Sequence, residues 1–233
     1  MIVAIDGPAG SGKSTVARAI ARDCGCIYLD TGAMYRSVAL LALEGGVALD
    51  DEVALAALGR SMELSFGRAA DGSQTVQLNG VDVTNAIRTP QVDEAVSAVS
   101  SVSAVRAIMV ERQRALAVGA DVVAEGRDIG TVVFPAAEVK VFLTASPEAR
   151  AHRRAVQNRE RMTPTAEATD EARVLAALIE RDEADSTRAV SPLRPAEDSV
   201  HIDSSCVPVE EVVRQVETLI AQARTTTQEG EER

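Results

Sequence analysis

The sequence has few of the residues that mark several large classes of protein. Aromatic residues make up 2% of its 233 residues and tryptophan is absent, so it has little with which to bind single-stranded nucleic acid by base stacking. Three cysteines are too few for a disulfide framework, and a lone C-x-C lacks the second ligand pair of a zinc site. No apolar run is long enough to span a membrane, and the first ten residues carry no basic group of a signal peptide. We therefore expect a cytoplasmic protein with free thiols, an aliphatic core and no membrane partner.

Positive charge is scarce too. The formal net charge is −11, and Lys13 and Lys140 are the only lysines among the 24 lysine and arginine side chains. A nucleic-acid polymer needs a basic surface, so no such polymer is expected as a partner. Genomic preference for arginine is one explanation of the missing lysines, and a chemical requirement for lysine where it remains is the other. Lys140 falls within a predicted strand and is interpreted as structural.

Short β-branched segments alternate with longer amphipathic stretches over most of the chain. This alternation predicts an α/β fold of three layers, in which helices cover both faces of a five-stranded parallel sheet. The strands are predicted at 2–6, 27–30, 122–125, 139–145 and 200–203. The helices are predicted at 13–23, 33–44, 92–117, 147–159, 167–184 and 208–223.

The pattern changes between about residues 61 and 90, where shorter strands follow one another directly. Asn79-Gly80 separates two of these strands and is a strong signal for a two-residue hairpin. The segment is therefore predicted to be a small antiparallel insertion, with strands at 63–66, 74–78 and 81–83.

No linker in the sequence is long enough to separate two independent domains. We expect a single domain over 1–224, with a core formed by 1–60, 91–147 and 185–224. Residues 225–233 are polar and acidic, so they are expected to be a disordered tail.

The strongest motif is GPAGSGKST, which follows the first predicted strand and precedes a predicted helix. In this context G-x-x-x-x-G-K-[ST] forms a phosphate-binding loop, whose backbone N–H groups and helix N-terminus hold the phosphates of a nucleoside triphosphate. Lys13 supplies a compact charge that a planar arginine could not, and the Ser14 hydroxyl is the predicted ligand of Mg²⁺. The expected ATP-binding residues are Gly7, Pro8, Ala9, Gly10, Ser11, Gly12, Lys13, Ser14 and Thr15. A guanine-specifying Asn-Lys-x-Asp is excluded, because neither lysine lies in one.

Three clusters that contain arginine follow predicted strands or lie on a predicted helix. Their sequences are DTGAMYR at 30–36, EGRDIGT at 125–131 and RDEADSTR at 181–188, whose spacing predicts that Arg181, Asp185 and Arg188 share one helix face. Taken singly, each cluster is explained equally well by surface salt bridges or helix caps. Together they favour a phosphate-bearing ligand, which guanidinium groups bind in a fork.

These segments resemble a known family. The order GPAGSGKST, LDTGAMYR, IRTPQVDEAVSAVS, EGRDIGTVVFP and ERDEADSTRAVSPL is similar to that of bacterial cytidylate kinases, which are nucleoside monophosphate kinases with a phosphate-binding loop. The resemblance runs from residue 1 to about 220. It implies the reaction ATP + (d)CMP → ADP + (d)CDP, with Mg²⁺ as cofactor. It also implies that the insertion near 61–90 binds the monophosphate and that the basic segment 148–162 is a lid.

The resemblance implies roles for individual residues. Arginines at the positions of Arg36, Arg127 and Arg188 hold the acceptor phosphate in the family. Other positions of the substrate site are implied for Thr31, Tyr35, Ser97, Arg106, Asp128, Arg181 and Asp185, of which Ser97, Arg106 and Asp128 face the cytosine, and Asp185 and Arg181 the ribose. Lys13, Arg127, Arg188 and Arg154 are the expected catalytic residues, and Arg153 is expected to bind ATP. The family often has aspartate where this chain has Glu125, so a direct role for that carboxylate is left open.

Two other functions are weighed against this one. The first is a related kinase that acts on UMP, AMP or a small metabolite, against which the cytosine-facing residues argue. The second is an ATP-binding switch module without turnover, which leaves the three acceptor arginines unexplained. The expected partners are ATP and CMP or dCMP, and the protein is expected to be a monomer.

Overall fold

The computed structural model describes residues 1–159 and 169–231, and the chain divides into two compact units. The first unit contains 1–30 and 117–233, and the second contains 31–116. The insertion predicted at 61–90 therefore supplies only part of the second unit. Of the predicted lid, 148–159 is described, whereas 160–162 lies outside the described residues.

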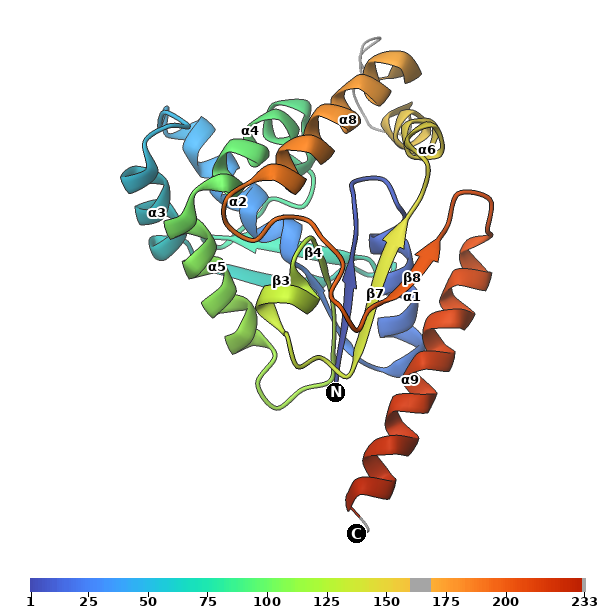
Figure 1. Cartoon of the computed structure of the whole chain (residues 1–233). Helices are drawn as coiled ribbons and strands as arrows, with labels where there is room; N and C mark the ends of the chain where they lie inside the picture. The colour runs from blue at the N-terminus through green and yellow to red at the C-terminus, as the bar shows by residue number, and fades with distance from the viewer. Residues whose placement is uncertain (160–168, 232–233) are drawn as a thin grey trace. The chain divides into compact units, whose positions relative to one another are not determined.

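The first unit is built on a parallel sheet of five strands, as the sequence predicts (Figure 1). The strands are β1 (Ile2–Asp6), β2 (Ile27–Asp30), β6 (Val122–Gly126), β7 (Val139–Thr144) and β8 (Val200–Asp203). Their order is β2-β6-β1-β7-β8, and every neighbouring pair is parallel. β1 therefore lies in the middle, with the phosphate loop at its carboxyl end.

Helices and one helical turn lie between these strands or follow the last of them. They are α1 (Lys13–Cys24), the π-helical turn η2 (Ile129–Val133), α6 (Pro147–Arg159), α8 (Glu171–Thr187) and α9 (Val209–Glu231). α1 and α9 pack together over one face of the sheet, where Ile5, Ile20, Leu143 and Val216 are buried in a single apolar cluster. No aromatic side chain is among the buried members of this cluster, which agrees with the expected aliphatic core.

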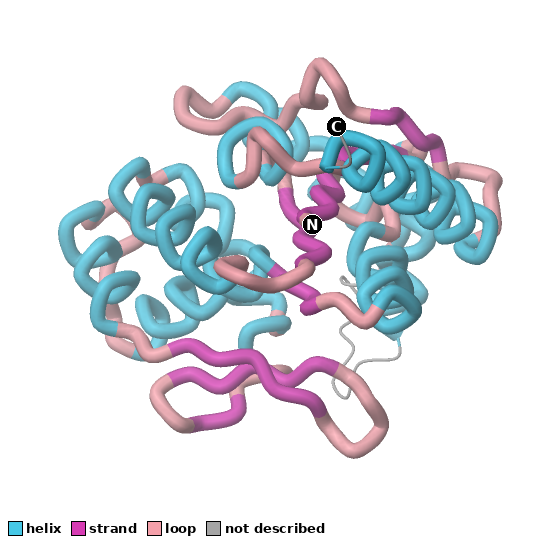
Figure 2. Tube along the Cα trace, turned by 90° about the horizontal axis from the view of Figure 1, so that it is seen from below, coloured by secondary structure: helices cyan, strands magenta, loops and turns pink. Residues whose placement is uncertain are grey.

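The second unit contains four α-helices, a short 3₁₀ turn and a small antiparallel sheet (Figure 2). Its helical elements are α2 (Thr31–Glu44), α3 (Glu52–Ser61), η1 (Ala86–Arg88), α4 (Pro90–Ser101) and α5 (Ser103–Leu116). Its strands are β3 (Leu64–Arg68), β4 (Gln74–Leu78) and β5 (Val81–Asp82), paired in that order. Asn79 and Gly80 have φ angles of 50° and 80° between the paired residues Leu78 and Val81. The predicted two-residue hairpin is thus confirmed, since both turn residues adopt the left-handed conformation that it requires.

The helices of the second unit differ from the prediction in two ways. The single helix expected at 92–117 is two helices, because Val102 has an extended backbone that interrupts the hydrogen-bond ladder while its side chain stays buried. α3 was not predicted. Its signal was Asp51, whose carboxylate accepts the Ala54 N–H and caps the helix.

The C-terminal prediction also needs correction. A disordered tail was expected at 225–233, but 225–231 continue helix α9, and 232–233 lie outside the described residues. The hydroxyls of Thr225 and Thr226 donate to the carbonyls of Ala221 and Gln222, four residues earlier. A helix already anchored on the sheet can be extended by such local bonds without an apolar face of its own.

Other expectations can be tested directly on this structure. Cys24, Cys26 and Cys206 are free thiols. The ammonium of Lys140 donates to the Pro135 carbonyl at 2.6 Å and lies 2.7 Å from the Asp198 carboxylate, so its structural interpretation is confirmed. Among the described residues, no helix is sufficiently long and apolar to cross a membrane.

Truncating a buried side chain of β1 should destabilise the protein far more than truncating an exposed one on β2. Ile5 is completely buried, so Ile5→Ala should lower the free energy of unfolding by about 3 kcal/mol through lost burial and an unfilled cavity. Ile27 is 51% exposed, so Ile27→Ala should cost less than about 1 kcal/mol. Urea denaturation followed by far-ultraviolet circular dichroism measures both. Equal losses would contradict the assigned core.

Candidate active site

The phosphate loop runs from the end of β1 to the start of α1 and packs tightly against its surroundings. Gly7 has a φ of 148°, and a Cβ placed there would lie 2.0 Å from the Leu143 carbonyl oxygen of β7. Gly12 caps α1 in the left-handed conformation, with a φ of 93°. Both positions exclude an ordinary side chain, the first because there is no space and the second because of backbone strain.

Lys13 folds back over this loop. Its ammonium donates to the Pro8 carbonyl at 2.7 Å, and the Ser11 hydroxyl donates to the same oxygen at 3.0 Å. Burial lowers the pKa of Lys13 to about 7, and the positive charge of Arg127 adds to this effect. A bound anion would favour the charged ammonium and so raise that pKa again. The loop therefore holds a cation that an incoming phosphate stabilises.

Asp6, at the end of β1, is a site residue that the sequence analysis missed. Its carboxylate accepts the backbone N–H groups of Ile129 at 2.8 Å and Gly130 at 2.7 Å. These bonds anchor the start of η2, directly after Arg127 and Asp128. Burial raises the pKa of Asp6 to about 6, against the opposing effect of the two hydrogen bonds. The only signal in the sequence was a carboxylate at the end of a buried central strand.

Two carboxylates lie side by side on neighbouring strands next to the loop. Asp30 of β2 pairs in register with Glu125 of β6, and both are buried. Glu125 accepts hydrogen bonds from the Tyr28 and Ser14 hydroxyls, while burial and the charge of Asp30 raise its pKa.

This group of oxygens fits Mg²⁺ bound together with phosphate. Mg²⁺ prefers hard oxygen ligands and commonly keeps its waters and substrate oxygens in the inner shell. In 1–159 and 169–226, whose side chains the structure describes, no group of three or more His, Cys, Asp or Glu side chains is arranged to hold a metal. The hydroxyl of Ser14 and the carboxylates of Asp30 and Glu125 are the oxygens beside the loop that could hold Mg²⁺, directly or through its waters.

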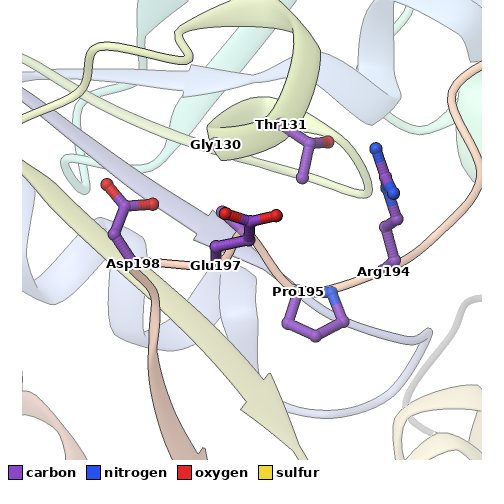
Figure 3. Close-up of a pocket in the computed structure, with 7 residues that line it drawn as sticks. Gly130, Thr131, Arg194, Pro195, Glu197 and Asp198 are labelled. Atoms are coloured by element: carbon purple, nitrogen blue, oxygen red, sulfur yellow. The ribbon is translucent and has the colours of Figure 1, made fainter.

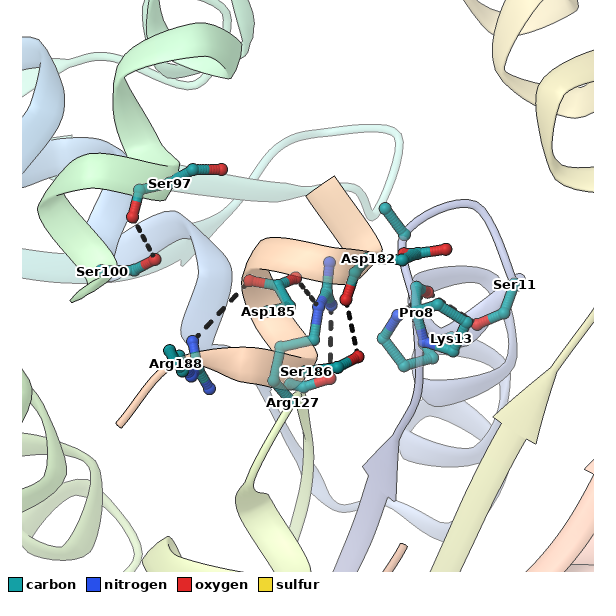
Figure 4. A network of polar contacts seen from close by, with 12 residues as sticks. Pro8, Ser11, Lys13, Ser97, Ser100, Arg127, Asp182, Asp185, Ser186 and Arg188 are labelled. Atoms are coloured by element: carbon teal, nitrogen blue, oxygen red, sulfur yellow. Dashed lines mark hydrogen bonds and ion pairs between the residues drawn. The ribbon is translucent and has the colours of Figure 1, made fainter. Parts of the chain in front are cut away.

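A second polar cluster lies at the carboxyl end of β6 (Figure 4). Nε of Arg127 donates to the Asp185 carboxylate of α8 at 2.8 Å, and Nη1 of Arg188 lies 3.8 Å from its other oxygen. Burial alone would raise the pKa of Asp185, but the charges of Arg127 and Arg181 outweigh it and hold the pKa below its usual value. The structure thus brings together Arg127, Arg181, Asp185 and Arg188.

One detail of this cluster differs from the prediction. Arg181 and Asp185 are on α8, whereas Arg188 follows the last helical residue, Thr187, and has an extended backbone. Nε of Arg188 donates to the Ser191 carbonyl at 2.5 Å. Arg188 thus reaches Asp185 from the connecting segment rather than from a shared helix face.

Asp128 follows Arg127 and is 4% exposed. Its carbonyl accepts the N–H groups of Val132 and Val133, which begins the π-helical turn.

The other predicted substrate residues belong to the second unit. The Arg36 guanidinium lies 2.5 Å from the Asp93 carboxylate and also donates to the Ile87 carbonyl at 3.1 Å. Arg106 is 3% exposed, donates to the Ser100 carbonyl and places its guanidinium carbon 5.3 Å from the centre of the Tyr35 ring. The pairing of Arg36 with Asp93 gave no recognisable signal in the sequence.

Thr31 and Ser97 are placed by the helices of the same unit. Thr31 begins α2 and is 4% exposed, and Ser97 lies on α4, where its carbonyl accepts the Ser100 hydroxyl (Figure 4). Thr31, Tyr35 and Arg36 therefore share α2, which presents them within one turn and a half.

The arginines of α6 differ in their surroundings. Arg153 donates to the hydroxyl and the carbonyl of Ser204, at 3.0 Å and 2.5 Å. Ser204 is buried, and its hydroxyl lies 3.0 Å from the Ser11 carbonyl of the phosphate loop. Arg154 donates to the side chain of Gln157 one turn away. Arg153 is therefore connected to the phosphate loop through Ser204.

A separate hollow of about 250 Å³ lies between η2 and the segment before β8 (Figure 3). Its lining residues are Gly130, Thr131, Arg194, Pro195, Ala196, Glu197 and Asp198. None of the residues predicted for ATP or substrate lines it.

The sequence is similar to those of known proteins over most of its length. A family model described as cytidylate kinase matches residues 3–222. A cytidylate kinase of Pelotomaculum thermopropionicum is 50% identical over 222 residues, which is 95% of this chain and 96% of that protein. A cytidylate kinase of Nocardia farcinica is 48% identical over 227 residues, or 97% and 96% of the two chains.

The fold has solved relatives as well. A crystal structure of an uncharacterised protein from Eubacterium ventriosum superposes with a TM-score of 0.51 and 13% sequence identity, covering 95% of this chain and 98% of that one. At this low identity the likeness supports the fold alone.

The raised pKa of Asp6 predicts a pH-dependent part of the protein's stability. The pKa is about 6 in the folded protein against an ordinary value of 3.8, so the native state binds more protons between these values. Stability should therefore fall as pH rises from about 4 to about 6, and Asp6→Asn removes this component. The free energy of unfolding of the wild type, relative to the variant, should drop by on the order of 3 kcal/mol across that range.

Urea denaturation of both proteins at several pH values measures this difference. Asparagine also turns a donor towards a backbone N–H, but that cost is the same at every pH. If the free energies of unfolding of the wild type and Asp6→Asn change in parallel with pH, Asp6 has an ordinary pKa in the folded protein.

Proposed function

This chain belongs to the cytidylate kinase family, and we propose that it transfers the γ-phosphoryl group of ATP to CMP or dCMP with Mg²⁺ as cofactor. The observation that carries the proposal is the cluster of Arg127 and Arg188 around Asp185, in the same compact unit as the phosphate loop. Two guanidinium groups held at the end of a sheet suit the phosphate of a second nucleotide. We expect the protein to act as a monomer on these small molecules.

The donor side is assigned to the loop from Gly7 to Thr15. Its backbone N–H groups would surround the β- and γ-phosphates, and Lys13 would move from the Pro8 carbonyl to the phosphate oxygens. Ser14 would hold Mg²⁺, with Asp30 and Glu125 accepting from its waters. When bound, the metal neutralises charge that develops on the phosphate oxygens.

The acceptor side is assigned to Arg127 and Arg188, and the family resemblance adds Arg36. Arg127, Arg188 and Arg36 would bind the phosphate of CMP, each released from the carboxylate that holds it now. No general base is required, because a phosphate monoester is already ionised at neutral pH. The task of these side chains is to hold two polyanions in line and to offset their repulsion.

Recognition of the nucleoside is assigned by the family resemblance. Ser97, Arg106 and Asp128 would face the cytosine, whose amino group suits a carboxylate and whose ring nitrogen and carbonyl suit donors. Arg181 and Asp185 would address the ribose, and Thr31 and Tyr35 would complete the substrate site. The burial of Arg106 and Asp128 supports these assignments, since only groups away from water discriminate strongly between bases.

A lid is proposed for the basic segment 148–162, with Arg153 and Arg154 on the triphosphate. Closure would exclude water, which otherwise competes with CMP as the phosphoryl acceptor. The contact between Arg153 and Ser204, beside the phosphate loop, supports a place near the donor.

The substrate assignment is tested by ADP release with different acceptors. CMP and dCMP should support turnover, whereas UMP and AMP should be used less efficiently by a factor on the order of 100 or more, because the site hydrogen-bonds cytosine. A coupled assay with each monophosphate at equal concentration measures this. Preferred use of UMP or AMP would identify a related kinase, and ADP release independent of any monophosphate would favour a switch module.

The division into donor and acceptor residues is tested by two matched substitutions. Arg127→Met should lower kcat/KM for CMP by a factor on the order of 100 to 1000, because a guanidinium on the acceptor phosphate is lost. Its dissociation constant for ATP should stay within about threefold of the wild-type value. Lys13→Met should instead weaken ATP binding.

Arg22→Met is the control, since Arg22 is exposed on α1 and pairs with its neighbour Asp23. Steady-state kinetics and calorimetric titration with ATP separate the effects. Equal damage to ATP and CMP by Arg127→Met would overturn the acceptor assignment.

A further inference from the structure

The guanidinium of Arg150 joins three parts of the first unit. Arg150 is on α6 and is 4% exposed. Its Nε donates to the Ala145 carbonyl at 3.0 Å, and its Nη1 donates to the Ala9 carbonyl of the phosphate loop at 3.1 Å. The same Nη1 lies 2.6 Å from Oδ2 of Asp182 on α8. A guanidinium withdrawn from water in this way takes its position from these acceptors.

Packing ties the same three parts together. A Cβ on Gly10 of the loop would lie 3.1 Å from Cβ of Arg150 and 3.3 Å from its carbonyl oxygen. Ala9 packs against a small apolar cluster formed by Ala151 of α6 with Val174 and Leu178 of α8. The loop, α6 and α8 thus share one core, in which a displacement of one part is felt by the others.

The helix that Arg150 holds carries acceptor-side residues. Asp182 precedes Asp185 by three residues on α8, so both side chains lie on adjacent parts of one helix surface (Figure 4). Asp185 in turn binds Arg127. Contacts therefore link Ala9 to Arg150 and Arg150 to Asp182, and helix α8 links Asp182 to the cluster assigned to the CMP phosphate.

We propose that Arg150 is a positioning residue that couples the donor site to the acceptor site. The inference rests on the proposed function and adds a residue that touches neither substrate. A triphosphate that orders the loop also orders the Ala9 carbonyl, and hence the guanidinium that holds Asp182. α8 is then held in place before CMP binds, so CMP does not bear that cost of ordering, and each nucleotide strengthens the binding of the other.

A purely structural role is the competing explanation, and the chain offers a matched control for it. Glu171 of α8 also reaches α6, with its carboxylate 3.0 Å from Nδ1 of His152 and 3.8 Å from the Arg159 guanidinium. These contacts are exposed and involve no residue of the phosphate loop. Glu171→Gln therefore weakens the pairing of α6 with α8 without touching the path through Ala9.

The test is calorimetric titration of CMP into the protein, alone and with a saturating non-hydrolysable ATP analogue and Mg²⁺. In the wild type the analogue should tighten CMP binding about tenfold. In Asp182→Asn this factor should fall below about twofold, while the affinity for CMP alone stays within about twofold of the wild type. Glu171→Gln should keep the wild-type factor.

Three outcomes would overturn the proposal. They are a wild type without coupling, an unchanged factor in Asp182→Asn, and an equal loss of coupling in Glu171→Gln. If Asp182→Asn does not fold, Arg150→Lys decides: lysine keeps the charge beside Asp182 but cannot serve all three acceptors, so the factor should fall below the wild-type value. An Arg150→Lys protein with wild-type coupling would equally exclude the role.

The coupling factor can be measured whether or not the protein phosphorylates CMP. Absence of CMP phosphorylation in the ADP-release assay would refute the proposed function, because that assay measures chemistry. The coupling factor compares two binding constants, so it tests Arg150 separately.

Discussion

The backbone of the phosphate loop passes so close to β7 that no side chain fits at Gly7, and much of the first unit depends on this contact. It requires β1 and β7 to be hydrogen-bonded neighbours, with Asp6 opposite Phe142. Because β7 lies next to β1, the segment after β7 also lies beside the loop. Helix α6 starts in this segment, and its Arg150 packs against Gly10 of the loop. The strand order of the sheet therefore decides which side chains surround the phosphates.

Cations of this acidic protein that are largely withdrawn from water have acceptors within their own compact unit. Lys13 donates to the Pro8 carbonyl, Arg127 to Asp185 and Arg36 to Asp93, each within one compact unit. Isolated buried charges would be costly, so these partners stabilise the side chains in the absence of nucleotide. In the proposed function, a phosphate group would compete with these acceptors for the same guanidinium and ammonium groups. The present contacts would then keep the cations oriented, at a moderate cost to nucleotide binding.

Carboxylates of the sheet serve two separate purposes in this arrangement. Asp6 accepts two backbone N–H groups and so shapes the turn that follows Arg127. Glu125 accepts the Ser14 and Tyr28 hydroxyls and forms, with Asp30, the oxygen-rich side of the loop. Glu125 was left open by the sequence because its side chain is one methylene longer than the family's common aspartate. Its contact with Ser14 now places it beside the loop.

Local patterns in the sequence were sufficient for much of the architecture. The alternation of strands and helices, the glycines of the phosphate loop and the turn at Asn79-Gly80 each depend on residues close in the chain, and each was predicted. The break at Val102 was missed because a buried valine fits a helix or a bend equally well by its pattern. The extension of α9 was missed because a polar composition does not reveal a helix that is anchored elsewhere.

What the sequence by itself determined was the set of groups available: the motif of a phosphate-binding loop, the arginines that we propose for a second anion, and the motifs of one enzyme family. Only the tertiary structure decided which acceptor each of these groups meets. Asp6 contacts residues more than a hundred positions away, Arg127 meets Asp185 across 58 positions, and Arg150 meets Ala9 across 141. Such pairings depend on strand order and on the packing of helices, which no periodicity within one segment records.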